Sequence, residues 1–226
     1  MSLSYETRVL AFVDLLGFSK LVLTSPSNAE AMAKVVGVMN LLFKFEQENY
    51  ELLQNHAEDV SFCSDCVVLS GSIDRLWCVF REIGKLARQA LAIGVPCRGG
   101  VATDDCYHRR GMVVGPAMVT AYRLEQAAKH PRIVLDDGTV ELWKAHVKDE
   151  INPAAWSDVV RLDEDGRWYI NIFHQHFDGG LPWSCLPVSR KDILDGAQNV
   201  IGAGLLHPCP KIQFKYAWLN NEINSN

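Results

Sequence analysis

Two aspartates of this 226-residue chain stand where apolar, strand-like segments break off abruptly. Asp14 ends one such segment shortly before Gly17, and Asp65 lies in a two-residue turn between the segments 59–63 and 66–70. Taken alone, each aspartate is more typical of an ordinary turn. Taken together, two carboxylates can hold a pair of divalent cations against a triphosphate. The sequence therefore predicts a two-cation site, provided that folding brings Asp14 and Asp65 together.

The pattern of apolar residues predicts the elements that would position these carboxylates. The predicted strands are 8–13, 59–63, 66–70, 97–103, 111–114, 132–135, 159–162 and 168–173. The predicted helices run from a capping box at Ser27 and Glu30 to about 54, over about 73–93 and 116–129, from 136 to about 147, near 190–205 and near 211–222. This order predicts an α+β fold, a ferredoxin-like sheet containing antiparallel strands with helices on one face.

Three local details accompany this prediction. The first long helix is indicated by apolar residues at helical spacing, which are Met32, Val35, Val36, Met39 and Phe43. A charged loop is expected from Asp104 to Arg110, between two strands of a hairpin. We expect one domain over 1–226, with a core of about 8–150 and a C-terminal hairpin and helices over 151–226.

Composition excludes several classes of protein. The chain is 48% hydrophobic with a net charge of -5, which suits a globular protein and argues against one that coats nucleic acid. It contains neither an apolar segment long enough to span a bilayer nor a signal-peptide pattern, so we expect a cytoplasmic protein. The odd number of cysteines, 7, predicts reduced thiols, and we interpret Cys63 and Cys66 as plain buried thiols rather than zinc ligands or a redox pair.

Four segments stand out in chain order: Phe12–Phe18, the turn Ser64-Asp65 with the apolar strand after it, Arg98–Thr103, and Gly115–Glu125. In this order they resemble the signature motifs of class III nucleotide cyclases. Each motif alone is weak, but the ordered set is specific. The resemblance covers roughly residues 8–135 and fades beyond 150, so the C-terminal part would be a divergent extension of the catalytic domain.

The resemblance implies a fold and a reaction. A ribose 3′-hydroxyl would attack the α-phosphorus of a nucleoside triphosphate, with pyrophosphate leaving and two Mn²⁺ or Mg²⁺ ions per site. Asp14 and Asp65 would bind both metals, and Leu15 would add its backbone carbonyl. Arg123 would stabilise charge on the α-phosphoryl oxygens. The turn formed by Leu16, Gly17 and Phe18 would offer backbone amides to phosphate oxygens.

The resemblance also implies a head-to-tail homodimer. Metal ligands would come from one chain and base or ribose contacts from the other, so a monomer would be inactive. A two-fold dimer would carry two equivalent sites.

Three departures from the family pattern bear on the substrate. The helical Asn that orients the ribose falls on Val119, which cannot form a hydrogen bond with its side chain. The two positions that read a purine base fall at about Asp59 and Met112, which match neither the adenine nor the guanine pair. Asp59 could accept a hydrogen bond from the N3–H of uracil or the amino group of cytosine, and it is equally interpretable as a polar residue at the start of a strand.

The third departure concerns the triphosphate. The lysine that many family members use on the phosphates is not identifiable, and the candidate replacements are Lys129, Arg109 and Arg110. Arg109 and Arg110 lie in the predicted charged loop, where simple solvation is the default interpretation.

These departures and the strand over 167–173 resemble the bacterial pyrimidine cyclases of the Pycsar antiphage system. The preferred hypothesis is therefore a uridylate cyclase that converts UTP to cyclic UMP and pyrophosphate. A cytidylate cyclase is the second hypothesis, nearly as well supported, and a purine cyclase is the third. A degenerate, non-catalytic module that binds a nucleotide or a partner is the alternative from another class. A palm-like polymerase or diguanylate cyclase is a further one, opposed by the absent G-G-D-E-F turn and the acidic balance.

Overall fold

A computed structural model of the chain describes residues 4–53, 59–109, 111–150, 152–178 and 188–225. Its core is an 8-stranded sheet in the order β2-β3-β1-β4-β6-β8-β7, with β5 paired to β4. The strands are β1 (Glu6–Leu15), β2 (Asp59–Cys63), β3 (Cys66–Ser72), β4 (Cys97–Arg109), β5 (Met112–Val114), β6 (Ile133–Leu135), β7 (Val160–Leu162) and β8 (Trp168–Ile170).

The α-helices are α1 (Phe18–Thr24), α2 (Ala29–Leu53), α3 (Leu76–Ala92), α4 (Pro116–Ala127), α5 (Asp137–Lys148), α6 (Arg190–Leu205) and α7 (Pro210–Asn224). Short 3₁₀ helices cover Ser25–Ser27, Ile73–Arg75, Pro153–Trp156 and Gln175–Phe177. None of the helices in the described part of the chain combines the length and apolar character needed to cross a bilayer.

The centre of the sheet has the ferredoxin-like order that the sequence predicts. β1 lies between β3 and β4 and is antiparallel to both, and β2 and β3 form a hairpin at one side. β6 joins β4 in parallel, and β8 and β7 extend the sheet with antiparallel pairs. The α+β fold class is therefore confirmed, and the predicted hairpins at Asp65 and at 163–166 are present.

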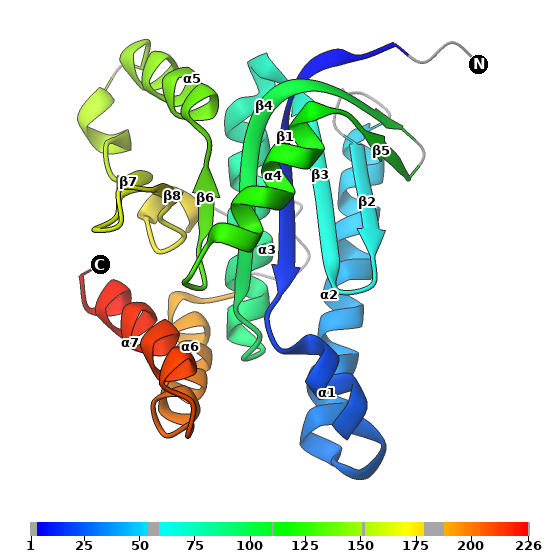
Figure 1. The fold of residues 1–226 in the computed structure, drawn as a ribbon, viewed down its shortest axis with the longest axis vertical. Coiled ribbons are helices and arrows are strands. Elements are labelled where there is room, and N and C mark those ends of the chain that lie inside the picture. The colour runs from blue at the N-terminus through cyan, green and yellow to red at the C-terminus, as the bar shows by residue number, and fades with distance from the viewer. Residues whose placement is uncertain (1–3, 54–58, 110, 151, 179–187, 226) are drawn as a thin grey trace.

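Helices cover both faces of the sheet, so the expectation of helices on one face was wrong. Alternate residues of β1 enter two different apolar clusters. Val9, Ala11 and Val13 pack with α2 and α3 on one face, whereas Leu10 and Phe12 pack with α4 on the other. Figure 1 shows α4 in front of β1 and β4, with α2 and α3 behind the sheet.

Gly100 on β4 allows the close approach of α4. A Cβ atom there would overlap the carbonyl oxygen of Ala121 and the side chain of Leu124. Because α4 lies directly on β4, its residues Ala121 and Glu125 are buried against the sheet. The Arg98–Thr103 motif therefore serves a packing role in addition to any chemistry.

Helix α2 exposes the apolar residues that predict it. Met32, Val36, Met39 and Phe43 are exposed, and the buried face consists of other residues, which include Val38, Leu41, Leu42 and Phe45. The helical spacing of these apolar residues thus predicted the helix correctly, although most of them face solvent instead of the core. The capping box was wrong, because the side chain of Asn28 accepts the hydrogen bond from the Ala31 amide at 3.0 Å.

Two strand ends also differ from the prediction. β1 continues through Asp14 to Leu15, so the first aspartate lies within the paired part of the strand. β4 continues to Arg109, and the predicted loop 104–110 is therefore mostly strand. Position 110 lies outside the described residues.

Candidate active site

The register of the central strands brings the two aspartates together. Asp14 lies opposite Cys66 in the β1–β3 ladder. Cys66 directly follows Asp65, which belongs to the β2–β3 turn. Ser64, the other residue of that turn, has a φ of 59°. The amide of Leu15 donates to the carbonyl of Asp65 at 3.0 Å, which ties the end of β1 to the turn. Both carboxylates therefore lie at the same edge of the sheet.

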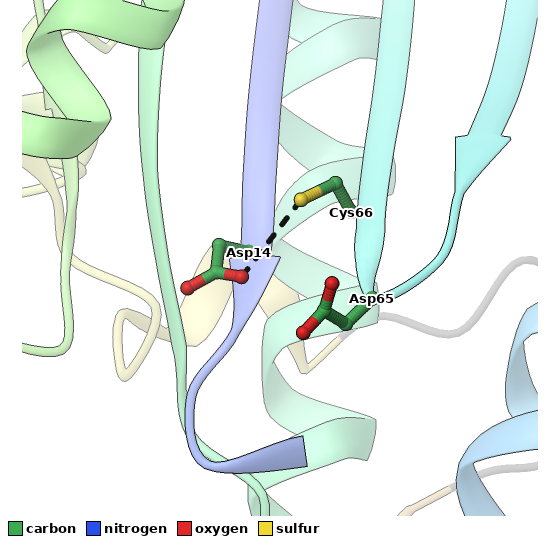
Figure 2. A group of neighbouring side chains, drawn as sticks. All are labelled: Asp14, Asp65 and Cys66. Atoms are coloured by element: carbon green, nitrogen blue, oxygen red, sulfur yellow. Dashed lines mark hydrogen bonds between the residues drawn. The ribbon is translucent and has the colours of Figure 1, made fainter. Parts of the chain in front are cut away.

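Figure 2 shows the side chains of Asp14 and Asp65 directed toward each other, with Cys66 beside them. One potential ligand atom from each of these three residues lies within 4.8 Å of the other two. The Cys66 thiol donates to Asp14 Oδ1 at 3.8 Å, and the Ser19 hydroxyl of α1 donates to Asp65 Oδ2 at 3.0 Å. The structure thus brings together the two carboxylates that the sequence singles out.

A buried ion network lies behind Asp14. Arg98 Nη2 is 3.7 Å from Asp14 Oδ2, and the same guanidinium nitrogen contacts Glu125 Oε1 of α4. Burial raises the pKa of the Asp14 carboxyl above its ordinary value, and Glu125 and Asp65 add to this, while Arg98 opposes it. Asp14 therefore lies in a partly desolvated, net negative cluster, and an added cation would stabilise its carboxylate form.

The donor set fits a hard divalent cation. Asp14 and Asp65 supply carboxylate oxygens, and both are only partly buried, so a ligand can reach them. Such oxygens are what Mg²⁺ and Mn²⁺ bind in phosphoryl-transfer sites. Cys66 adds a soft donor, which would also admit thiophilic metals.

The turn after β1 is only partly available for phosphate. The Leu16 amide donates to the carbonyl of Pro96 at 2.9 Å, so it already has an acceptor within the chain, and its role toward phosphate stays a prediction. Gly17 has a φ of 78°, which lets the chain turn sharply into α1. The roles of Gly17 and Phe18 stay predictions, as does that of the Leu15 carbonyl.

Arg123 is not brought to the carboxylate pair of its own chain. It is exposed on α4, whereas Glu125, two residues later and therefore about 200° around the helix, faces Arg98 and Asp14. Val119, one turn before Arg123, is also exposed. Within one chain, these two positions point away from the metal candidates.

The expected base-reading residues lie away from the pair. Asp59 faces Ser70, four residues along β3 from Cys66, which corresponds to about 13 Å. Its carboxylate accepts a hydrogen bond from Arg8 Nη2 at 3.0 Å. Burial raises the pKa of Asp59, although Arg8 opposes this. Met112 is exposed on β5.

Asp59 belongs to a polar network on the same face of the sheet as α4. Arg8 Nε also donates to Ser70 Oγ at 3.0 Å, and the buried His108 ring contacts the hydroxyls of Ser61 and Ser70 at 2.8 and 2.9 Å. Burial, together with the nearby Arg8, lowers the pKa of His108 to about 4, so the ring is neutral at pH 7.

Neither described replacement for the missing lysine lies at the site. Arg109 pairs with Glu6 at 3.0 Å at the far end of β4, and Lys129 is exposed after α4. Arg110 lies outside the described residues. Sequence reasoning missed Ser19 and Glu125 as neighbours of the two aspartates. Glu125 stands in the quoted α4 motif, but only the fold shows that it pairs with Arg98.

Five described cysteines are reduced thiols outside any disulfide, as expected: Cys66, Cys78, Cys97, Cys106 and Cys209. Cys97 and Cys106 are buried, and burial raises the pKa of both thiols, to about 11 for Cys106. Cys66 is not a plain buried thiol, because it is part of the carboxylate cluster. The side chain of Cys63 and all of Cys185 lie outside the described residues.

Solved structures show what this geometry resembles. The chain is similar to a bacterial light-regulated adenylyl cyclase with a TM-score of 0.52 and 15% identity over 78% of this chain and 95% of that one. It is similar to the adenylyl cyclase CyaB from P. aeruginosa with a TM-score of 0.51 and 16% identity over 75% and 95% of the two chains. The chain has the fold of a class III nucleotide cyclase catalytic domain.

A second structure of a bacterial light-regulated adenylyl cyclase matches over 62% of this chain at 17% identity with a TM-score of 0.47, and the chain spans only 45% of that protein's length. Comparison with models of protein families found no match, and neither did comparison with curated protein sequences. The cyclase fold of this chain is thus established by structure, at identities too low to carry a substrate across.

Proposed function

We propose that the chain is a metal-dependent nucleotide cyclase that converts a nucleoside triphosphate to a 3′,5′-cyclic nucleotide and pyrophosphate. The observation that carries the proposal is the convergence of Asp14 and Asp65 at one sheet edge, with potential ligand atoms within 4.8 Å of each other. This is the arrangement that the sequence motifs require, and it occurs on the fold of adenylyl cyclase domains.

Two Mg²⁺ or Mn²⁺ ions bound there would lower the pKa of the attacking ribose hydroxyl and offset the charge of the triphosphate. The protein's own part is to hold the carboxylates in place. Ser19 orients Asp65, the Leu15–Asp65 backbone bond fixes the turn, and Arg98 shields Asp14 from Glu125.

A head-to-tail homodimer would complete the site. Arg123 is exposed, points away from its own carboxylate pair and has no hydrogen-bond or ion-pair partner among the described residues. Four exposed apolar residues lie on α4 or on β5, the strand just before it, and they are Met112, Val114, Val119 and Tyr122. A second chain that covers these residues would bring its own Arg123 to the metal pair of the first. Arg123 would then stabilise charge on the α-phosphoryl oxygens.

The finer proposal is a pyrimidine substrate, with UTP preferred over CTP, and a role in antiphage signalling through the cyclic product. Its support is the departure from the purine pattern at Asp59 and Met112 and the resemblance to the pyrimidine cyclases. Asp59 is an acceptor that Arg8 holds in position, which suits an N–H or amino donor on a base presented by the partner chain.

A degenerate, non-catalytic cyclase-like module is the second candidate, favoured by Val119. This residue is exposed on α4 at the position where the family has a ribose-binding Asn, and its side chain cannot form a hydrogen bond.

The test is incubation of the protein with each of the four nucleoside triphosphates and Mn²⁺, followed by mass spectrometry of the products. The proposal predicts a cyclic nucleotide and pyrophosphate, most abundant with UTP, and none from the Asp65→Asn variant. Preference for a purine would refute the base assignment alone. Absence of any cyclic product from all four substrates would favour the non-catalytic module.

A further inference from the structure

Helix α2 has an apolar face that the core does not cover. Its buried face enters the core cluster through Val38, Leu41, Leu42 and Phe45. Four other apolar residues, which we call the α2 stripe, are 43%, 49%, 53% and 59% exposed in chain order, and they are Met32, Val36, Met39 and Phe43. At 3.6 residues per turn, the centre of the α2 stripe lies about 140° around the helix from the centre of the buried face. The stripe is therefore a separate surface rather than the margin of the core.

The α2 stripe is a continuous uncharged surface. From Met32 to Phe43 the helix contains one charged residue, Lys34. Lys34 lies about 200° around the helix from Met32 and pairs with Glu30 Oε1 at 2.9 Å. Single exposed apolar residues are ordinary on a protein surface, but an aligned set over about three helical turns is typical of an interaction surface.

The spacing of the α2 stripe is that of a seam between two helices. Successive members are 4, 3 and 4 residues apart, as in helices that pack side by side. This spacing is the same when read from either end. A two-fold interface needs such self-complementarity, because each residue must face a residue of the same set. Antiparallel pairing of two copies places Met32 opposite Phe43 and Val36 opposite Met39.

The charge at the end of the α2 stripe also favours a second copy. Glu46 is exposed and is the next residue in line with the stripe, three positions after Phe43. In the same antiparallel pairing it faces Ala29, the first residue of the other α2. The first turn of a helix carries free amide groups and the positive end of the helix dipole, which favour a nearby carboxylate. The two-fold axis produces this contact twice.

A lipid surface is the competing occupant of an exposed apolar helix face. Helices that lie in a membrane interface are rich in Lys and Arg beside their apolar face. The charged residues of α2 around the stripe are instead balanced, two acidic and two basic, and they are Glu30, Lys34, Lys44 and Glu46. This balance favours a protein partner over an anionic membrane.

The α2 stripe is remote from the surface that carries Arg123. Helix α2 packs on one face of the sheet and α4 on the other, and Figure 1 shows α2 behind the sheet with α4 in front. A contact through α2 therefore leaves the α4 side free for the head-to-tail dimer.

We propose that the α2 stripe is a two-fold interface through which two copies of this chain associate, with their α2 helices packed antiparallel. This contact goes beyond the proposed function and requires neither nucleotide nor metal. Where head-to-tail dimers also form, the α2 contact joins them into larger assemblies.

The test measures molar mass by multi-angle light scattering over a range of protein concentrations. It uses a Val119→Glu background, in which a charge on α4 disfavours the head-to-tail contact, and this protein should be a dimer. Adding Met39→Glu should raise the dissociation constant about a hundredfold or more and give a monomer, because a carboxylate would be buried between the helices. The matched control is Leu206→Glu, at a residue that is 87% exposed outside the stripe, and it should stay a dimer. Thermal unfolding shows whether each variant is folded.

Disulfide cross-linking tests the antiparallel arrangement. Proteins carrying Val36→Cys and Met39→Cys are mixed and oxidised, and the linked peptides are identified by mass spectrometry. The predicted main product joins position 36 of one chain to position 39 of the other. Main products that join 36 to 36 and 39 to 39 would indicate parallel helices and overturn the arrangement.

Three results would overturn the inference as a whole. They are a background protein that is monomeric at every concentration, a molar mass that Met39→Glu leaves unchanged, and an equal loss of mass with Leu206→Glu. Binding of a monomeric protein to vesicles of phosphatidylcholine and phosphatidylserine, lost in Met39→Glu, would assign the stripe to a membrane instead. None of these measurements uses a nucleotide, so an α2 dimer without any cyclic product would reject the proposed function alone.

Discussion

The guanidinium of Arg98 lies 3.7 Å from the carboxylate of Asp14, so the first candidate metal ligand already has a cationic neighbour inside the chain. Glu125 of α4 forms an ion pair with the same guanidinium and compensates part of its positive charge. Arg98 therefore stabilises Asp14 as an anion without fully neutralising it. A divalent cation could therefore bind Asp14 and Asp65 without first breaking a strong ion pair between Asp14 and Arg98.

Removing Glu125 should destabilise the fold. Its side chain is only 1% exposed, and the Glu125→Ala substitution leaves Arg98 with a buried, poorly compensated charge. We expect the free energy of unfolding in urea to fall by about 3 kcal/mol. The matched control is Glu141→Ala on the surface of α5, which should change it by less than about 0.5 kcal/mol. Equal effects in the two variants would show that the Arg98–Glu125 contact contributes little.

Mixing two inactive variants should restore activity if the site is shared. In a heterodimer of Asp14→Ala and Arg123→Ala, one of the two sites combines an intact metal half with an intact Arg123. After mixing in equal amounts, half of the dimers are heterodimers, and about one quarter of the wild-type activity returns. Cyclic nucleotide formation before and after mixing measures this. No recovery would indicate that Asp14 and Arg123 act within one chain.

Cys66 should give the site an affinity for thiophilic metals. Its sulfur lies 3.8 Å from Asp14 Oδ1, and thiolates prefer Cd²⁺ over Mg²⁺. We expect Cys66→Ala to weaken Cd²⁺ binding by tenfold or more and to change Mg²⁺ binding by less than about threefold. Calorimetric titration with each metal measures both affinities. A parallel loss of both would mean that the thiol orients Asp14 rather than binding metal.

The stability of the fold should decrease in mild acid. Burial holds the pKa of His108 at about 4 in the folded chain, and His130, whose ring is also buried, has a pKa of about 4. Since an unfolded histidine titrates near 6.5, the unfolded state binds more protons between about pH 6.5 and 4. The free energy of unfolding should therefore fall as pH falls through this window and level off below it.

Urea unfolding at several pH values measures this dependence. The His108→Gln variant should be less stable than wild type at neutral pH and should show a shallower dependence on pH, with His130 accounting for part of the remaining slope. A pH dependence as steep as that of wild type would exclude His108 as a contributor.

The sequence predicted those parts of the site that local chemistry determines. The turn at Asp65 and the strand before Gly17 are specified by residues close to each other in the chain, and the order of strands then makes β1 and β3 neighbours. Helix α4 packs on the face of the sheet opposite to α2 and α3, and it does so because Gly100 has no side chain to hold it away. The alternation of apolar residues within a strand does not reveal such a close approach. The Arg98–Glu125 contact follows from that placement and could not be predicted before it.

In the C-terminal part of the chain, too, the sequence predicts the helices but not how they pack. The helices near 190–205 and 211–222 were predicted from the sequence, but the position of α7 against the core depends on how Trp218 meets Asp163 and His130, residues distant in sequence. The apolar stripe on α2 shows the converse case, because correct helical spacing did not reveal that Met39 and Phe43 face solvent.

The most direct measurement is the anomalous diffraction of Mn²⁺ in crystals grown with a non-cyclisable triphosphate analogue. Two Mn²⁺ peaks about 3.5–4 Å apart are predicted, each within coordination distance of carboxylate oxygens of both Asp14 and Asp65. The same crystals of Asp65→Asn should show the peaks weakened or lost. Manganese bound elsewhere, or an Asp14–Asp65 pair without metal at saturating Mn²⁺ and nucleotide analogue, would contradict the account.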